Sequence, residues 1–208
     1  MGIPVLIMRE SGSGKSTSLR NFEPGEIGIF NVASKPLPFR KKLTSADAAD
    51  YPMIVNTLNA HNLLRYAIDD SQYLLAFEFF SHADEKGYEK FTNMALNFYN
   101  LIRFIQFNTP PDCIVYFLHH VETSYDSAGN RRLKAKTIGK MLDEKLTVEG
   151  LFSIVLLCQS DSTGRHFFQT QSNGNSTAKS PMEMFPAEID NDLKQVDSAI
   201  RDYYGLQK

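Results

Sequence analysis

Short apolar runs recur along the chain and are separated by longer stretches of mixed polarity. The five runs lie within residues 3–8, 26–32, 61–70, 113–118 and 151–157. Runs of this length that are rich in Val, Ile, Leu and aromatic side chains are typical of strands buried on both faces. They therefore predict a sheet that is covered on both sides.

Four of the intervening or following stretches have helical periodicity. They are residues 15–22, 85–107, 138–149 and 191–204. Strands that alternate with helices form mostly parallel sheets with helices on both faces. The pattern therefore predicts an α/β fold with three layers, in which ligands bind beyond the carboxyl ends of the strands.

Residues 166–171 follow a turn and are expected to return beside residues 151–157 as an antiparallel hairpin, ahead of the C-terminal helix. Prolines within residues 34–42 exclude regular structure there and leave a basic loop. The chain has no repeat, low-complexity tract or shift in composition, so residues 1–208 are expected to form a single domain.

Composition and charge limit which classes of function are compatible with the sequence. The 208 residues are 42% hydrophobic, which suffices for one buried core. Lys and Arg number 22 against 24 Asp and Glu, a net charge of −2, so contact with nucleic acid requires a local basic patch. The longest apolar stretch is too short to cross a bilayer, and the N-terminus lacks the features of a signal peptide. A cytoplasmic protein without membrane contact is expected.

The two cysteines, Cys113 and Cys158, lie in predicted strands, where a thiol behaves as a small buried hydrophobe. No Cys/His cluster has the spacing of metal ligands. A bound metal is therefore expected to be an oxygen-ligated ion such as Mg²⁺.

The strongest chemical signal is the segment 9–16, Arg-Glu-Ser-Gly-Ser-Gly-Lys-Ser, between a predicted strand and a predicted helix. In this context the P-loop motif wraps a phosphate chain with backbone N–H groups, and its lysine and hydroxyl reach the terminal phosphates and Mg²⁺. The alternative is an ordinary Gly/Ser turn at the start of a helix. The candidate nucleotide-binding residues are Glu10, Ser11, Gly12, Ser13, Gly14, Lys15, Ser16 and Thr17.

Arg9 stands where the P-loop motif has its first glycine. If that position needs a backbone conformation that is unfavourable for a residue with a Cβ, the loop is strained or reshaped. If it does not, the arginine adds a cation near the phosphates.

Asp69 and Asp70 follow a predicted strand. A carboxylate at the end of a neighbouring strand orders Mg²⁺, and a second one orients the attacking water. Asp69 is therefore the candidate metal-side residue, with Ser16, and Asp70 is the candidate base. A plain turn or helix cap is the alternative for such a pair.

His119, His120 and Glu122 follow the strand at 113–118, where a polar residue can sense the terminal phosphate. Strand alternation points one imidazole toward the end of the sheet and the other away, and a structural role is the alternative for both. The candidate catalytic residues are Lys15, Asp70, His120 and Glu122.

Two basic segments contain Lys134, Lys136 and Lys179. These lysines are candidates for a finger that stabilises phosphate charge on a neighbouring subunit, or for contacts to a DNA backbone. Lys35 and residues 40–42 are candidates for the same DNA role, with Phe39 stacking on unpaired bases. Solvated surface charges are the alternative.

Four segments together resemble a family of phage P-loop nucleotide-binding proteins from phages of Gram-positive bacteria. The segments are residues 10–18, 69–73, 136–145 and 173–181, and the similarity spans nearly the whole chain. The wider relatives are AAA/RecA-like ATPases associated with single-strand annealing and recombination. The resemblance implies a RecA-like P-loop core, ATP and Mg²⁺ as cofactors, homo-oligomers with nucleotide between subunits, and single-stranded DNA as partner, in the host cytoplasm.

The leading hypothesis is a Mg-dependent ATPase that acts with single-stranded DNA in phage recombination or replication. One rival is a small-molecule P-loop kinase with an arginine-rich lid within residues 131–136. A second rival is a non-catalytic nucleotide switch that acts as a helicase-loading partner, which the arginine at position 9 favours.

Overall fold

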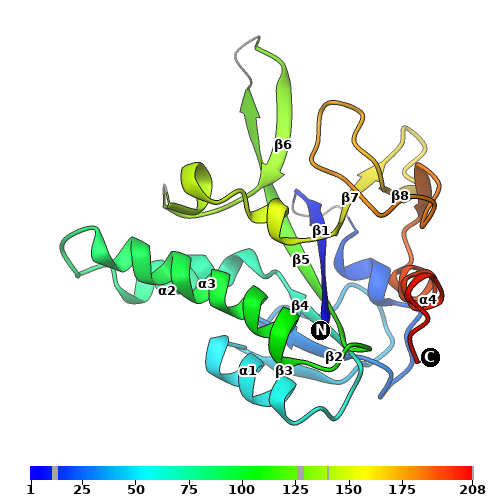
Figure 1. Cartoon of the computed structure of the whole chain (residues 1–208), viewed down its shortest axis with the longest axis horizontal. Coiled ribbons are helices and arrows are strands. Elements are labelled where there is room, and N and C mark those ends of the chain that lie inside the picture. Colours follow the sequence, from blue (N-terminus) through cyan, green and yellow to red (C-terminus); the bar gives the residue numbers. More distant parts are fainter. Residues whose placement is uncertain (11–13, 126–128, 140, 208) are drawn as a thin grey trace.

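The computed structural model of the protein describes residues 1–10, 14–125, 129–139 and 141–207. These residues form an α/β structure around a nine-stranded sheet in the order β3-β2-β4-β5-β1-β7-β8-β9, with β6 paired to β5 (Figure 1). The six strands from β3 to β7 in this order are mutually parallel. They are β1 (Ile3–Arg9), β2 (Gly28–Asn31), β3 (Ser45–Asp47), β4 (Arg65–Asp69), β5 (Ile114–Tyr125) and β7 (Ile154–Ser160).

Three antiparallel strands extend this parallel core. β8 (His166–Gln169) pairs with β7, and β9 (Glu188–Asp190) pairs with β8, which confirms the predicted C-terminal hairpin. β6 (Arg131–Ala135) pairs with the outer half of β5, so these two strands leave the sheet as a projecting hairpin (Figure 1). The sequence predicted a basic segment at 131–136 but not its pairing, because pairing depends on a partner strand.

Helices cover both faces of the sheet. One apolar cluster joins one face to α1 (Tyr51–Asn59), α2 (Gln72–Ser81) and α3 (Glu89–Asn108). A second cluster joins the other face to α4 (Leu193–Tyr204) and to a 3₁₀ turn, η1 (Ser16–Leu19). The predicted three-layer α/β architecture is therefore confirmed, and it is consistent with a RecA-like core.

Two helix predictions are wrong. The stretch 15–22 contains only η1, because the Ser18 hydroxyl donates to the Lys15 carbonyl and competes with helix hydrogen bonds. The stretch 138–149 contains a π-helical turn (Met141–Lys145) and the start of a 3₁₀ turn (Val148–Leu151), with no α-helix among its described residues. The sequence also did not predict α1 and α2, whose helical form depends on packing against the sheet.

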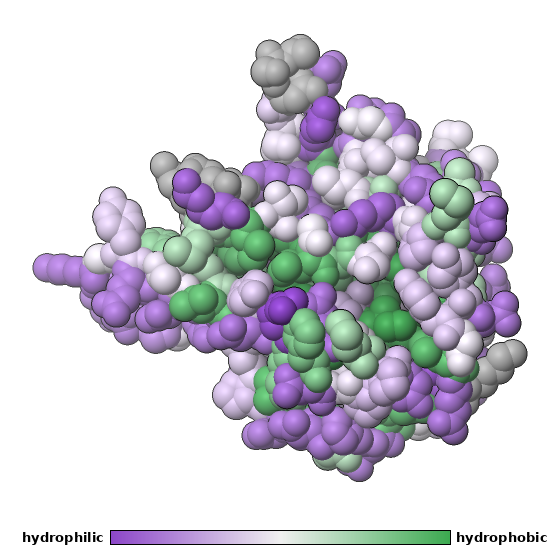
Figure 2. All heavy atoms as spheres, viewed as in Figure 1, coloured by the Kyte–Doolittle hydropathy of each residue, from purple (hydrophilic) through white to green (hydrophobic). Residues whose placement is uncertain are grey.

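Cys113 and Cys158 are buried, as predicted, and neither forms a disulfide in the structure. Figure 2 shows apolar side chains gathered across the middle of one molecular face, with hydrophilic side chains around them. Within the part of the chain that the structure describes, no helix combines the length and apolarity needed to cross a bilayer.

Candidate functional site

The predicted site residues come from the carboxyl ends of three parallel strands near the middle of the sheet. β5 lies between β1 and β4, and Arg9 at the end of β1 is paired with His120 on β5. Asp69 ends β4. β4, which carries the aspartates, is thus not the immediate neighbour of β1, which corrects the expected adjacency. Side chains from all three strand ends still meet at one edge of the sheet.

The last glycine of the predicted P-loop, Gly14, adopts a left-handed backbone conformation with φ of 88°. A Cβ at this position would also lie 3.2 Å from the ring of His166 on β8. Both constraints favour glycine. The predicted loop residues Ser11, Gly12 and Ser13 lie outside the described residues.

Lys15 points back over the backbone of residues 9 and 10. Its Nζ donates to the carbonyls of Arg9 and Glu10, at 3.2 Å each, and the residue is only 5% exposed. Burial lowers the pKa of Lys15, while Asp70 and Asp69 act in the opposite direction. A cation held in this way is available to a phosphate without a large rearrangement.

Ser16 and Asp69 form the closest side-chain pair of the two motifs. The Ser16 hydroxyl donates to Asp69 Oδ1 at 2.7 Å, across 53 positions of sequence. Burial raises the pKa of Asp69, and the hydrogen bond from Ser16 opposes this effect. One hydroxyl and one carboxylate are the oxygen ligands that Mg²⁺ uses beside phosphates and water.

Asp70 is held by two partners. His120 Nε2 lies 3.0 Å from Asp70 Oδ1, and Lys35 Nζ lies 2.8 Å from Asp70 Oδ2. Burial acts to raise the pKa of Asp70, but these hydrogen bonds outweigh it and bring the pKa to about 2. Asp70 also has a φ of 59°, which is a strained conformation for a residue with a Cβ.

The two histidines separate as strand alternation predicts. His120 faces the site, whereas His119 is fully buried and lies 2.9 Å from both the Ser71 hydroxyl and the Lys136 carbonyl. Burial lowers the pKa of His119 to about 4. His119 is therefore a neutral structural residue at physiological pH, and His120 is the member of the pair that can contact a ligand.

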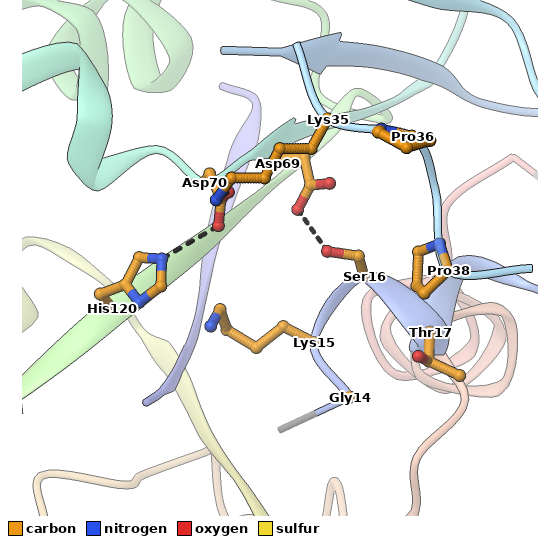
Figure 3. A pocket seen from close by; sticks show the side chains of 10 residues that line it. All are labelled: Gly14, Lys15, Ser16, Thr17, Lys35, Pro36, Pro38, Asp69, Asp70 and His120. Atoms are coloured by element: carbon orange, nitrogen blue, oxygen red, sulfur yellow. Dashed lines mark hydrogen bonds and ion pairs between the residues drawn. The ribbon is translucent and has the colours of Figure 1, made fainter. Parts of the chain in front are cut away.

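These side chains surround a cavity of about 220 Å³. Its size is below the roughly 300–1,000 Å³ of pockets that enclose a whole small ligand, so a bound nucleotide would extend beyond it. Figure 3 shows the Asp70–His120 and Asp69–Ser16 contacts on its wall. The lining residues are Gly14, Lys15, Ser16, Thr17, Lys35, Pro36, Pro38, Asp69, Asp70 and His120.

The remaining predicted residues do not line this cavity. Glu122 lies further along β5 and pairs with Lys134 across the hairpin, at 3.2 Å. The backbone of Lys136 bonds both histidines, and the backbone of Lys179 pairs with Val155. The Glu10 carboxylate contacts Arg131 at 3.2 Å. The structure thus brings residues 14–17, the two aspartates and His120 together around the cavity, whereas Glu122, Lys134, Lys136 and Lys179 do not line it.

Arg9 adopts regular strand geometry at the end of β1 and is not among the described residues with positive φ. Its guanidinium donates to the Ser160 hydroxyl at 2.8 Å, at the end of β7, and does not line the cavity. The first alternative, a strained backbone at Arg9, therefore does not apply, and the guanidinium is directed toward Ser160 on β7.

Sequence reasoning missed Lys35 as part of this site. In the sequence, Lys35 is one of several cations in a basic loop. Nothing in the sequence places that loop beside Asp70. Within the described residues, no group of three or more His, Cys, Asp or Glu side chains is arranged to hold a metal by itself.

A scan against models of protein families finds no match to this chain, and a search of curated proteins finds none. Function is therefore inferred from the side chains and the cavity themselves.

Proposed function

We propose that this protein binds Mg-ATP in the cavity at the carboxyl edge of the sheet and hydrolyses it while acting with single-stranded DNA. The observation that carries the proposal is the 2.7 Å contact between Ser16 and Asp69 beside the buried amine of Lys15. A lysine, a hydroxyl and a carboxylate in this arrangement at the end of a P-loop are what a magnesium–phosphate complex requires.

Each residue at the phosphate site has a distinct role. Lys15 donates to oxygens of the terminal phosphates in place of the carbonyls of residues 9 and 10. Ser16 and Asp69 would hold Mg²⁺ through their oxygens. The metal, when bound, neutralises phosphate charge and polarises the phosphorus that water attacks. The buried carboxylate of Asp69 fits this ligand, because a cation offsets the cost of burying its charge.

Asp70 and His120 orient the attacking water in this proposal. A carboxylate with a pKa of about 2 remains ionised at neutral pH and accepts a hydrogen bond from water, although it is a weak proton acceptor. The contact from His120 holds the carboxylate in one orientation. Positioning and charge stabilisation are the main contributions that proteins make to phosphoryl transfer.

The projecting hairpin of β5 and β6 is the proposed DNA-contacting element. It includes Arg131, Arg132 and Lys134, and it begins directly after His120. The backbone of Lys136, at the end of β6, bonds His120 O and His119 Nε2 at 2.9 Å each. These hydrogen bonds connect the base of the hairpin to the two histidines at the site, which supports coupling between DNA and nucleotide.

The proposal is tested by phosphate release from ATP and Mg²⁺, with and without single-stranded DNA, beside Lys15→Ala and the longer apolar variant Lys15→Met. We expect turnover that DNA stimulates and that both variants abolish, with melting curves showing that the variants remain folded. ATP turnover that persists in both folded variants would refute the assignment of the site.

One observation favours the second candidate function, a nucleotide switch without turnover. Both oxygens of Asp70 are already engaged, by His120 and by Lys35. If the wild-type chain binds ATP in a Lys15-dependent manner but releases no phosphate under either condition, the switch is the correct function.

A further inference from the structure

Lys35 reaches the phosphate cavity from the loop after β2, whereas Lys15 reaches it from the P-loop (Figure 3). We propose that Lys35 donates to the terminal phosphate of the bound nucleotide, so that the chain itself supplies the cation expected from a neighbouring subunit. This inference rests on the proposed nucleotide site. It assigns Lys35 a role in distinguishing triphosphates from diphosphates.

The backbone of Lys35 is held in place by a buried side chain. Asn31 Nδ2 donates to the Lys35 carbonyl at 2.8 Å, and Lys35 N donates to Asn31 Oδ1 at 3.2 Å. Asn31 is 6% exposed and also bonds Asp47 Oδ1 at 2.8 Å. Ser34, the preceding residue, has a φ of 52°. A strained residue that is held by buried hydrogen bonds is typical of a functional loop.

The side chain of Lys35 is directed over the cavity. Its Nζ lies 2.8 Å from Asp70 Oδ2 and 4.8 Å from the centre of the Tyr73 ring. An ammonium group has three N–H donors, and the contact with Asp70 uses one of them. The remaining donors are available to phosphate oxygens without breaking the ion pair.

The position of Lys35 identifies which phosphate it contacts. Asp70 and His120 orient water in the proposed function, so they must lie beside the phosphorus that water attacks. Lys35 bonds the same carboxylate and is therefore at the terminal phosphate. A nucleoside diphosphate has no phosphate group at that position.

Lys35 also removes the need for a cation from another subunit. The basic candidates Lys134, Lys136 and Lys179 do not line the cavity. Lys35 does, and a positive charge near the transferred phosphoryl group is the element that accelerates such reactions. Lys35 would therefore supply this charge from the same chain as Lys15.

The test measures the affinities of ATP and ADP, with Mg²⁺ and without DNA, by titration calorimetry. Lys35→Met keeps the length of the side chain and removes its charge. Lys41→Met is the control, because Lys41 lies in the same loop, pairs with Glu23 at 2.8 Å and does not line the cavity. We expect Lys35→Met to weaken the affinity for ATP by about tenfold and the affinity for ADP by less than about twofold. This is the effect expected for the loss of one charged hydrogen bond.

Equal weakening of both nucleotides, or of neither, would overturn the role of Lys35. That result differs from failure of the nucleotide site itself, in which the wild-type chain binds neither nucleotide or Lys15→Ala has no effect. Lys35→Arg should restore part of the preference for ATP, since it returns the charge with a different shape.

Mixing variants tests whether Lys35 acts within its own chain. A Lys35→Met chain retains Lys15, and a Lys15→Ala chain retains Lys35. If Lys35 acted across subunits, the mixture would assemble intact sites and recover the ATP preference or the turnover. We expect no recovery beyond the sum of the two separate samples.

Discussion

Arg9 stands where the P-loop motif has its first glycine. It lies in the last position of β1, pairs with His120 in the parallel register and donates to Ser160 at 2.8 Å. Strand geometry at this position suits a side chain with a Cβ better than it suits glycine, which loses more backbone entropy. The Arg9 side chain therefore links the ends of β1 and β7 through this hydrogen bond.

Replacing Arg9 with glycine should not raise ATP turnover. The change removes the hydrogen bond to Ser160 and places glycine in a strand, so it should destabilise the fold by about 1–2 kcal/mol. Urea denaturation and phosphate release on the same preparation measure both effects. Higher turnover in Arg9→Gly would show instead that the arginine impairs the site.

At the scale of elements, α4 is tied to the sheet by a buried charge cluster. Asp197 Oδ2 accepts from Arg65 at 2.6 Å and from Arg201 at 2.7 Å, and its Oδ1 lies 3.0 Å from the Tyr116 hydroxyl. Arg201 is 1% exposed and also donates to carbonyls at the start of β4 and β5. The cluster lies at the opposite edge of the sheet from the cavity lined by Lys15 and Asp70.

Asp197→Asn should destabilise the protein by about 3–5 kcal/mol, because it leaves the buried Arg201 without its counter-ion. The matched control is Asp190→Asn, which breaks an exposed pair with Arg165. That control should cost less than about 1 kcal/mol. Chemical denaturation measures both, and a similar small cost for the two variants would refute the importance of the cluster. ATP affinity of folded Asp197→Asn should be unchanged.

For the whole molecule, stability should depend on pH through His119. Its pKa is lowered to about 4 by burial, below the value of about 6.5 in the unfolded chain. The unfolded state therefore binds more protons between these values, so stability is complete above about pH 6.5 and falls as pH drops toward 4. The loss is on the order of 3 kcal/mol. Asp70, with a pKa of about 2, should add a further loss below about pH 4.

Denaturation of the wild-type chain and of His119→Gln at pH 7, 5.5 and 4.5 tests this dependence. The glutamine cannot gain a proton, so the variant should lose less stability than the wild type across this window. Parallel losses in the two proteins would show that other groups control the acid sensitivity.

Several features follow from the sequence alone, because they depend on neighbours along the chain. The alternation of apolar runs and amphipathic stretches predicts the α/β layers, and the order of residues 14–16 places a lysine beside a hydroxyl after a glycine turn. The two aspartates were predicted at a strand end for the same local reason. The bounds of the helices were predicted less well. Where a helix ends depends on tertiary packing and on side chains that compete with the backbone for its hydrogen bonds.

Tertiary structure decided which of these residues meet. The register of β5 between β1 and β4 turns His120 toward Asp70 and buries His119, and the pairing with β6 carries Glu122 away to Lys134. Lys35 reaches the site from a loop that is distant in sequence from Asp70. A hydrogen bond from Asn31 holds the backbone of Lys35 in place. Local sequence determines which chemical groups this protein has, whereas pairing between strands far apart in the chain determines which groups lie within hydrogen-bonding distance.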